Sequence, residues 1–436
     1  MAASSRRKTE KPDRATHQGA GVLVIEGGRS LRGSVGVSGS KNATLGAMAA
    51  ALLVKEDCVL ENVPDIGDVW RMADVLRSVG ALIEMPQPGV LRLNAANISG
   101  TAPPKELVAN LRGSFLILGA LLARCGQAAC APPGGDVIGQ RPIDVHLKGF
   151  QALGAEVRHE GDEFVAETKG LRGARVFMDY PSVLGTQNLM LAACIASGRT
   201  TVVNAATEPE VTSLADMLNL MGARILGAGT HTLTIEGVQR LHPVTYSIIP
   251  DRLEAGTYAI AAAITQGEVE IQCLNLEHLF SLIAKLREAG VEVDEGSASI
   301  QVRGKADLRA ISLQALPYPG LATDLQAPMA VLLTQARGVS YVHERVFDNR
   351  LLYVAELRKM GAEVVTTGTT TAIISGPTTL TGARVRALDV RAGAALVLAG
   401  LAARGRTEIE DVYHLDRGYE LLTEKLRGLG AEVRRV

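Results

Sequence analysis

The chain has 436 residues, with 45 lysines and arginines against 46 aspartates and glutamates, and a formal net charge of −1. At roughly 150 residues per domain, this length predicts two or three domains. Hydrophobic residues make up 47% and charged residues 21%, which is typical of a globular protein and excludes disorder of the whole chain. The balanced charge and an aromatic content of 3% argue against a nucleic-acid-binding protein.

The composition also bears on membrane insertion and on the state of the cysteine thiols. The longest apolar runs, such as residues 115–123, are shorter than the roughly 18 residues of a membrane span. Residues 1–20 are polar and basic, which predicts a disordered tail rather than a secretory signal. The five cysteines are Cys58, Cys125, Cys130, Cys194 and Cys273. Their odd number and the lack of a CxxC pair predict reduced thiols in a cytoplasmic protein without a zinc site.

Along the chain, one short phrase recurs six times, about once every 70 residues. It consists of an amphipathic stretch, a glycine and a short β-like run, as in FQALGAEVRH and LRKMGAEVVT. Its glycines are Gly80, Gly154, Gly222, Gly290, Gly361 and Gly430, at intervals of 68 to 74 residues. A second series, in which an Ala/Leu-rich helix ends before a strand, falls at Gly126, Gly198, Gly267, Gly338 and Gly405. The pattern predicts six related units, each with two helices and several strands.

The periodicity within a unit supports this interpretation. Helical spacing of apolar residues is found at Val211, Leu214, Met217 and Met221, and again at Tyr419, Leu422, Leu426 and Leu429. The glycine that follows suits a left-handed helix end, and the next residues alternate as a strand does. Six units predict two domains of three: residues 39–248, and residues 21–38 with 249–436, which contains both termini. An N-terminal strand within residues 21–37 is expected to pair with the C-terminal half, and a cleft between the domains is expected to bind a ligand.

Two segments near the start of the repeats could bind an anion. SGSKNAT places Lys41 and Asn42 at the start of an Ala-rich helix, where an anion pocket is plausible, although a solvated lysine after a helix cap is the commoner arrangement. APPGGDVIGQRP, residues 131–142, is a Gly/Pro-rich loop with Asp136 and Arg141, whose glycines would let it move over a ligand. Pro142 suits the first turn of the helix that follows. The alternative is a simple polar connection.

Further charged residues follow in the C-terminal half. Asp324 and Asp389 each stand at a helix start, where capping is the ordinary role of an aspartate. Cations at loop-to-helix junctions of different units are Lys41, Arg112, Arg141, Arg350, Arg391, Arg417 and Lys425. If the units pack with pseudo-symmetry, these junctions converge on the cleft and make a strongly cationic pocket for a small substrate with phosphate and carboxylate groups. Asp136 and Asp324 then become candidates for acid/base catalysis.

Several of these phrases resemble the UDP-N-acetylglucosamine enolpyruvyl transferase family. They include SGSKNATL, PPGGDVIGQRPIDVHL, PDRLEAGT, DVRAGAALVLAG and YHLDRGYE, and the match runs from about Val22 to Val436. The resemblance implies an inside-out α/β barrel of two domains, each with three similar units. It also implies transfer of the enolpyruvyl group of phosphoenolpyruvate to the 3′-hydroxyl of UDP-N-acetylglucosamine with release of phosphate. This is the first committed step of peptidoglycan precursor synthesis, proceeds by addition and elimination through a tetrahedral ketal, and needs no metal or organic cofactor.

The resemblance also assigns roles to individual residues. It implies phosphate binding by Lys41, Asn42, Arg141 and Arg417, carboxylate binding by Arg350 and Arg391, and proton abstraction from the sugar hydroxyl by Asp324. Contacts with the nucleotide sugar are implied for Arg141, Pro142, Ile143, Asp144, Val145, Tyr180, Pro181, Ser182, Val183 and Val346. Arg112 belongs to the same charged cleft, and Asp389 and Lys425 are expected to support it.

Asp136 stands where most members of the family carry a cysteine. A carboxylic acid can donate a proton if burial raises its pKa, but it is a poorer nucleophile than a thiolate. We therefore expect that this protein is not alkylated by fosfomycin, the epoxide that attacks the loop cysteine of other members. We also expect that the five cysteines of this chain are structural.

The sequence departs from the usual family pattern on the nucleotide side. Leu184 replaces a glycine, Thr207 an arginine, Ser213 an aspartate and Ala322 a proline. These changes leave room for a weaker or altered sugar substrate. Two alternatives remain: the sister transferase that acts on shikimate 3-phosphate, against which the PGGDVIGQRPIDVH segment argues, and a non-catalytic paralogue that binds UDP-sugars.

Overall fold

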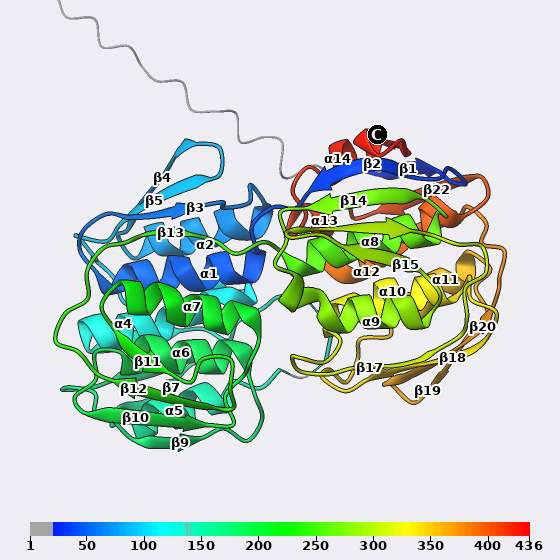
Figure 1. The fold of residues 1–436 in the computed structure, drawn as a ribbon. Coiled ribbons are helices and arrows are strands. Elements are labelled where there is room, and N and C mark those ends of the chain that lie inside the picture. Colours follow the sequence, from blue (N-terminus) through cyan, green and yellow to red (C-terminus); the bar gives the residue numbers. More distant parts are fainter. Residues whose placement is uncertain (1–20, 137, 140) are drawn as a thin grey trace, which may run out of the picture.

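The computed structural model of the chain describes residues 21–136, 138–139 and 141–436, so the expected disordered tail lies outside the described residues. The described chain forms two lobes that lie side by side (Figure 1). Each lobe has its own hydrophobic core, one built within residues 43–248 and the other from residues 23–37 and 253–433. We call these the central lobe and the terminal lobe. We propose that they are two domains, residues 39–248 and residues 21–38 with 249–436.

The central lobe contains seven of the α-helices and eleven of the strands among the described residues. Its helices are α1 (Lys41–Ala50), α2 (Gly67–Ser78), α3 (Lys105–Val108), α4 (Ile117–Cys125), α5 (Asp144–Ala152), α6 (Val183–Ala193) and α7 (Pro209–Leu220). Its strands are β3 (Cys58–Glu61), β4 (Leu82–Gln87), β5 (Val90–Asn94), β6 (Gln127–Cys130), β7 (Glu156–Glu160), β8 (Glu163–Glu167), β9 (Arg175–Phe177), β10 (Arg199–Val203), β11 (Arg224–Leu226), β12 (Thr232–Glu236) and β13 (Thr245–Ser247).

The terminal lobe combines the first two strands with the second half of the chain. Its helices are α8 (Arg252–Ile264), α9 (Phe280–Glu288), α10 (Gln326–Leu333), α11 (Tyr353–Lys359), α12 (Val390–Ala402), α13 (Tyr413–Asp416) and α14 (Leu422–Gly428). Its strands are β1 (Leu23–Glu26), β2 (Arg32–Gly36), β14 (Glu268–Gln272), β15 (Glu292–Glu295), β16 (Ser299–Arg303), β17 (Ser312–Ala315), β18 (Gly338–Glu344), β19 (Val364–Thr367), β20 (Thr371–Gly376), β21 (Arg384–Arg386), β22 (Arg406–Glu410) and β23 (Glu432–Arg435).

The six sheets of the described residues share one topology. In a representative unit, β9, α6, β10, α7, β11 and β12 follow one another, and the sheet order is β11-β12-β10-β9. Strands β9 and β10 are parallel, whereas β12 is antiparallel to both β10 and β11. Five sheets have four strands in this order and the sixth, β6-β8-β7, has three. Three sheets lie in each lobe, which confirms the two groups of three units predicted from the repeats.

The chain crosses between the lobes twice. Strand β1 is antiparallel to both β22 and β23, and β2 is parallel to β14, which confirms that the N-terminal strand pairs with the C-terminal half. Strand β13, at the end of the central lobe, pairs in parallel with β3. The two crossings lie side by side, because Gly39 and Pro250 form an antiparallel bridge. Both lobes therefore meet at a paired connection that also fixes the start of α1 and of α8.

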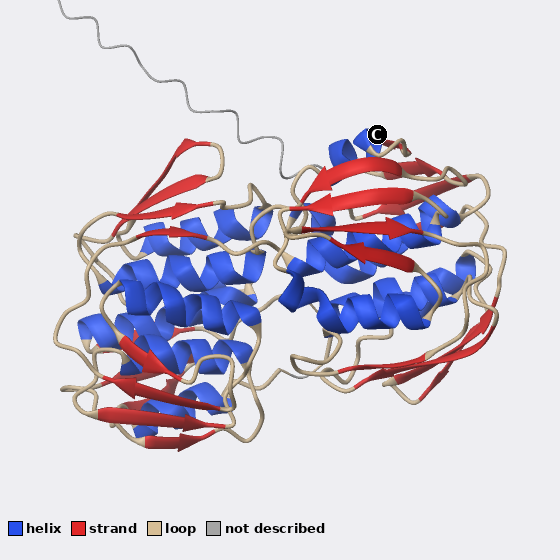
Figure 2. Cartoon of the chain, in the orientation of Figure 1, coloured by secondary structure: helices blue, strands red, loops and turns tan. Residues whose placement is uncertain are grey.

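Helices occupy the inside of each lobe and sheets the outside (Figure 2). All residues of α10 are buried, and so are all but one of the 13 residues of α12. A helix that is apolar on every side requires burial, and small residues let such helices pack closely. At Gly119, for example, an added Cβ would lie 2.5 Å from the backbone oxygen of Asn188 on α6. The arrangement is the inside-out α/β barrel.

The predicted helix ends are confirmed, with some shifts. The six glycines of the first series all have positive φ, between 88° and 103°. In the second series Gly267 does not, and Gln266 takes a φ of 50° instead. The helix expected from Tyr419 onward is interrupted: Leu421 has a φ of 49°, and α14 begins at Leu422. Tyr419 is instead held outside the helix, where its hydroxyl bonds with the Thr257 hydroxyl over 2.8 Å.

Pro142 does not lie in the first turn of the following helix, where it was expected. Helix α5 begins at Asp144, and Ile143 precedes it with a non-helical φ of −110°. The Tyr180 hydroxyl donates to the Pro142 carbonyl over 2.8 Å. Pro142 therefore belongs to the loop and not to the first turn, because its carbonyl is held by a side chain from another element.

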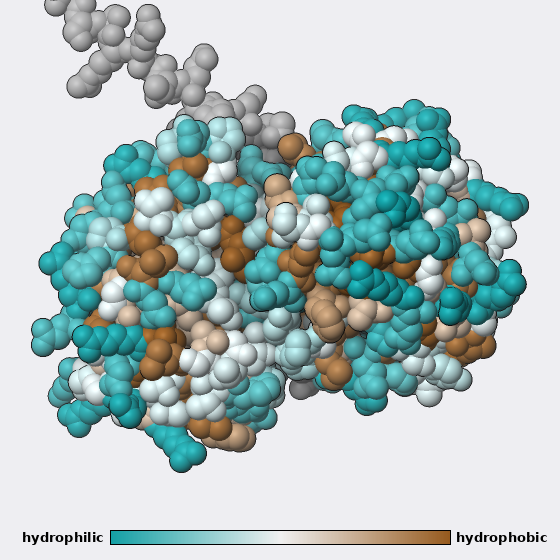
Figure 3. All heavy atoms as spheres, viewed as in Figure 1, coloured by the Kyte–Doolittle hydropathy of each residue, from teal (hydrophilic) through white to brown (hydrophobic). Residues whose placement is uncertain are grey.

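Other sequence expectations concern thiols, metals and membranes. All five cysteines are free, and burial raises the pKa of the Cys130 and Cys194 thiols to about 12. Within the described residues, no group of three or more His, Cys, Asp or Glu side chains is placed to hold a metal ion. Across the same residues, each helix is too short or too polar to span a bilayer. Hydrophobic residues on the face shown in Figure 3 form small separate groups among hydrophilic ones.

Candidate active site

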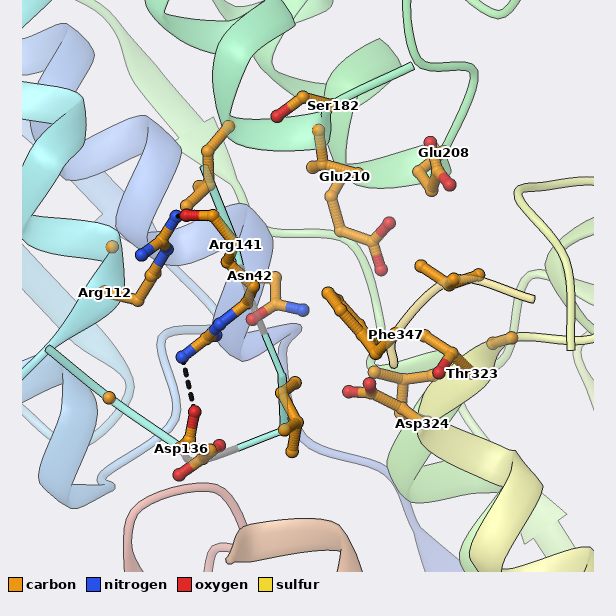
Figure 4. Close-up of a pocket in the computed structure, with 18 of the residues that line it drawn as sticks. Asn42, Arg112, Asp136, Arg141, Ser182, Glu208, Glu210, Thr323, Asp324 and Phe347 are labelled. Carbon is orange, nitrogen blue, oxygen red and sulfur yellow. Dashed lines mark hydrogen bonds between the residues drawn. The ribbon is translucent and has the colours of Figure 1, made fainter. Parts of the chain in front are cut away.

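A cleft with a cavity volume of about 480 Å³ lies between the lobes and is lined by both of them. Figure 4 shows side chains from the loop of residues 131–142, from α1 and α7 and from the terminal lobe pointing toward one another. The expected site residues that line it are Lys41, Asn42, Arg112, Asp136, Arg141, Pro142, Tyr180, Pro181, Ser182, Val183, Asp324, Val346, Arg350, Arg391 and Arg417. Six of the seven expected cations thus meet in one place.

Three of these cations lie at the start of a helix or turn, each in a different part of the chain. Lys41 is the first residue of α1, after Ser40, whose hydroxyl accepts from the backbone N–H of Ala43. Arg112 begins the 3₁₀ turn before α4, and Arg391 lies in the first turn of α12. The N-termini of these helices point at the cleft, and their positive ends favour anions there. The hypothesis that the junctions converge is confirmed for these residues.

Five expected residues do not line the cleft. They are Ile143, Asp144, Val145, Asp389 and Lys425. Asp389 caps α12 by accepting from the backbone N–H groups of Arg391 and Ala392 at 2.7 and 2.9 Å, so its ordinary capping role holds. Lys425 lies inside α14 and not at a junction, and donates to Glu254 over 2.6 Å and to Ser38 over 2.8 Å beside the crossing of the lobes.

One group of ion pairs, which we call the Asp68 cluster, joins the two lobes. Asp68 of α2 is 1% exposed, and it accepts from Arg417 of the terminal lobe over 2.9 Å and from Lys41 over 3.1 Å. Arg417 also donates to Asp136 over 2.5 Å. Burial alone would raise the pKa of Asp68, but Lys41 and Arg417 hold it below its usual range. The cluster therefore exists only where the lobes meet.

A second group, which we call the Asp324 cluster, lies wholly in the terminal lobe. Arg350 and Arg391 donate to the two oxygens of Asp324 over 2.7 and 2.8 Å. Arg350 also donates to the Thr323 hydroxyl over 2.7 Å. Burial would raise the pKa of Asp324, but the two arginines, with Lys41, lower it far below its usual range. In this arrangement Asp324 is a weak base, which any role as a proton acceptor has to overcome.

Arg391 has hydrogen-bonding capacity left over. It is 3% exposed, and only its Nε is used by Asp324. Its two terminal nitrogens, Nη1 and Nη2, are buried and have no hydrogen-bond partner within the described residues, and the guanidinium carbon lies 5.3 Å from the centre of the Tyr419 ring. Because Arg391 lines the cleft, these donors are placed for an anionic group of a ligand.

The loop of residues 131–142 closes one end of the cleft. Arg141 donates to the Asp136 carbonyl over 2.6 Å, the bond that is dashed in Figure 4, and Arg112 donates to the Arg141 carbonyl. The tip of the loop reaches the terminal lobe, where the backbone N–H of Asn349 donates to the Ile138 carbonyl over 3.3 Å. Residues 137 and 140 lie outside the described residues. The loop thus touches both lobes through backbone and side chain.

Several charged residues of the cleft were not predicted. They are Asp68, Glu208, Glu210 and Arg252. Arg252 of α8 donates to both oxygens of Glu210 over 3.1 and 3.2 Å, across the lobes. With them the described lining has seven Lys or Arg side chains and five carboxylates, so it is less strongly cationic than expected. Glu208, Glu210 and Arg252 lie in the phrases NAATEPE and PDRLEAGT, but their pairing depends on the fold.

The structure also shows the surroundings of His146 and of the four residues that depart from the family pattern. His146 lines the cleft, but burial lowers its pKa to about 3, and its Nδ1 is bonded to Asn188 over 2.9 Å, so it is a neutral packing residue. Among the four departures from the family pattern, Leu184 and Ala322 line the cleft. The Thr207 hydroxyl donates to the Tyr318 carbonyl over 2.6 Å, and Ser213 bonds to Tyr246 over 2.9 Å.

Known proteins give three kinds of match. A family model described as EPSP synthase (3-phosphoshikimate 1-carboxyvinyltransferase) matches residues 25–426. UDP-N-acetylglucosamine 1-carboxyvinyltransferase 1 of Caldanaerobacter subterraneus subsp. tengcongensis is 47% identical over 413 residues, covering 95% of this chain and 99% of the relative. UDP-N-acetylglucosamine 1-carboxyvinyltransferase of Trichlorobacter lovleyi is 48% identical over 416 residues, with the same coverage of both chains.

Solved structures agree on the fold. The enolpyruvyl transferase NikO from Streptomyces tendae has a TM-score of 0.87 at 28% identity and covers 96% of this chain and 99% of its own. EPSP synthase from Acinetobacter baumannii has a TM-score of 0.72 at 18% identity, covering 95% of this chain and all of its own, a likeness of fold alone. The chain therefore belongs to the enolpyruvyl (carboxyvinyl) transferase family, on the side of the UDP-N-acetylglucosamine 1-carboxyvinyltransferases, to which its relatives of 46–48% identity belong.

Proposed function

We propose that this chain transfers the enolpyruvyl group of phosphoenolpyruvate to the 3′-hydroxyl of UDP-N-acetylglucosamine and releases phosphate. The names of its relatives at 46–48% identity support this acceptor, whereas the shikimate enzyme is matched in structure at 18% identity. In the cleft, the observation that carries the proposal is the pair of unpartnered, buried guanidinium nitrogens of Arg391 beside Asp324. The reaction would supply peptidoglycan precursors from the cytoplasm.

The Asp68 cluster is the proposed phosphate end of the cleft. Lys41 and Asn42 at the start of α1, Arg417 at the end of α13 and Arg141 of the loop offer donors here. Asp68 and Asp136 accept the Arg417 N–H groups in the structure, so an incoming phosphate competes with Asp136 for this arginine. Since a phosphate carries more charge than a carboxylate, it can win that competition and release the Asp136 side chain toward the substrate.

The Asp324 cluster is the proposed carboxylate end. The free nitrogens of Arg391 and the guanidinium of Arg350 would hold the carboxylate of phosphoenolpyruvate. A second anion on these arginines weakens their hold on Asp324 and makes its carboxylate a stronger base. Substrate binding thereby converts a counter-ion into a proton acceptor for the sugar hydroxyl.

The chemistry follows from these positions. The hydroxyl oxygen of the sugar bonds to C2 of phosphoenolpyruvate while Asp324 takes the hydroxyl proton and C3 gains a proton, for which Asp136 is the proposed donor. In the resulting tetrahedral ketal, C3 returns a proton to the Asp136 carboxylate as the C2–O bond to phosphate breaks and phosphate leaves. The two stages are an addition to a C=C bond and an elimination, each with proton transfers, so this scheme uses only side chains of the cleft.

The sugar nucleotide is proposed to lie along the central-lobe wall. Arg141, Pro142 and residues 180–183 line this side of the cleft, and Val346 lines it from the terminal lobe. Ile143, Asp144 and Val145 lie outside the lining. Asp144 pairs with Lys148 through Oδ2 at 3.3 Å, while its Oδ1 has no hydrogen-bond partner within the described residues.

The test is phosphate release from phosphoenolpyruvate with UDP-N-acetylglucosamine or with shikimate 3-phosphate as acceptor. Release with the UDP-sugar alone supports the proposal, and release with shikimate 3-phosphate alone overturns it. Binding of the UDP-sugar without phosphate release would indicate a non-catalytic paralogue. Asp324→Asn and Asp136→Ala should both lower turnover, and full activity in both variants would remove the mechanism.

A further inference from the structure

We propose that Glu208 determines specificity for the acceptor, because the free oxygen of its carboxylate accepts a hydrogen bond from a sugar hydroxyl. This inference rests on the proposed function, since it concerns how the same cleft recognises the nucleotide sugar. Glu208 lies directly before α7 and lines the cleft, on the side of Ser182 (Figure 4).

Glu208 and Glu210 are neighbouring carboxylates with different hydrogen-bond partners. Both oxygens of Glu210 are taken by Arg252, so this carboxylate has a structural role between the lobes. Glu208 uses only Oε1, which accepts from the backbone N–H of Tyr318 over 3.3 Å. Its Oε2 is buried and has no hydrogen-bond partner within the described residues. Glu208 is therefore the carboxylate of the two that has an oxygen without a hydrogen-bond donor.

A buried carboxylate oxygen without a hydrogen-bond donor is energetically unfavourable, and a donor on a ligand can relieve this penalty. Burial raises the pKa of Glu208, because a charge without donors is poorly solvated. Arg252 of the same wall, whose charge acts on Glu208, is already held by Glu210 and lies over the Tyr318 ring with its guanidinium carbon 5.8 Å from the ring centre. A hydrogen-bond donor of a bound ligand can therefore satisfy Oε2.

The class of donor follows from the polarity of the cleft. Around the Asp68 and Asp324 clusters, the cleft offers cationic donors, including the two free nitrogens of Arg391. On the wall formed by α6 and α7 it offers free acceptors: Oε2 of Glu208 and Oε1 of Gln187, whose amide nitrogen donates to the Glu210 carbonyl over 3.1 Å. Anions are repelled from such a wall and hydroxyl groups are attracted, so it suits the sugar part of the acceptor.

The decisive variant is Glu208→Gln, because glutamine can keep the acceptor for the Tyr318 N–H and replaces Oε2 by an amide nitrogen. Loss of a hydrogen bond to a charged group predicts a KM for UDP-N-acetylglucosamine raised about 10- to 100-fold, with the KM for phosphoenolpyruvate changed less than about twofold. The matched control is Asp216→Asn, the same change from a carboxylate to an amide on α7, at an exposed residue that is not among the cleft-lining residues. It should leave both KM values near those of the unmodified protein.

Calorimetric binding of UDP-N-acetylglucosamine and of UDP completes the test without relying on turnover. Weaker binding of the UDP-sugar alone in Glu208→Gln places the hydroxyl on the hexose, and equally weaker binding of UDP places it on the ribose. Unchanged binding of both, or an equal loss in Asp216→Asn, overturns the inference. If the unmodified protein binds the UDP-sugar but releases no phosphate, the proposed function fails while this binding test stands. If it does not bind the UDP-sugar, both fail.

Discussion

The Asp68 and Asp324 clusters use the same chemistry but are assembled in different ways. Asp324, Arg350 and Arg391 all belong to the terminal lobe, so their contacts are present whatever the position of the central lobe. Asp68 and Asp136 belong to the central lobe and share Arg417 of the terminal lobe. One anion site is therefore built within a lobe, and the other is completed only by the contact between lobes.

This difference suggests an order of assembly. A carboxylate-binding end that is formed in advance costs little ordering on binding, whereas an end that spans two lobes couples phosphate binding to closure of the cleft. The loop of residues 131–142 belongs to the second end, because Asp136 pairs with Arg417 and the Ile138 carbonyl accepts from Asn349. Substitutions in the two clusters should thus fail in different ways.

The largest effect is expected from Asp324→Asn. It removes the proposed base while the free nitrogens of Arg391 remain, so turnover should fall by about 10²- to 10⁴-fold with little rise in the KM for phosphoenolpyruvate. Steady-state phosphate release measures both constants. A rise in this KM with unchanged turnover would show that Asp324 orders the arginines and does not accept a proton.

Arg417→Ala should act mainly through binding. It removes a proposed phosphate contact and the two ion pairs that Arg417 makes with the central lobe, so we expect kcat/KM for phosphoenolpyruvate to fall by about 10- to 100-fold. A suitable control is Arg435→Ala, which removes an ion pair with Asp416 at the edge of the same lobe. If the two variants behave alike, the cross-lobe cluster has no special part in binding.

A smaller change is expected at Asp136. The unmodified protein should resist fosfomycin, and Asp136→Cys should be inactivated at least about tenfold faster, because Arg417 next to this position favours a thiolate. Mass spectrometry of the intact protein after exposure detects the covalent adduct. An adduct on the unmodified protein, or none on the cysteine variant, would contradict the expectation.

The smallest effect concerns stability and pH. The pKa of Asp324 is lowered by folding, so its ion pairs stabilise the fold above the pKa of the unfolded chain, about 3.9, and are lost as pH falls below it. At pH 7, Asp324→Asn should lower the free energy of unfolding by on the order of 2 kcal/mol. Denaturant unfolding at pH 7 and near pH 3 should show the difference shrinking in acid. A difference independent of pH would refute the ion-pair explanation.

Much of the fold could be predicted because it depends on patterns of residues that lie close together in the sequence. The glycine series predicted left-handed helix ends, and the six units appear as six sheets in two groups of three. Local patterns were less reliable where a tertiary contact competed with them. Tyr419 bonds to Thr257 instead of continuing a helix, and the Pro142 carbonyl is held by Tyr180 before α5 can begin.

The sequence by itself determined the repeat, the two-part organisation and the cations at helix starts, because these depend on residue types at short and regular spacings. Only the tertiary structure decided which carboxylate serves which cation. Asp68 meets Arg417 from 349 residues away, and Arg252 completes Glu210 but leaves Glu208 with a free oxygen. A single charged residue in a sequence has no visible partner, and its role is set by the burial and distances that the packing of the two lobes creates.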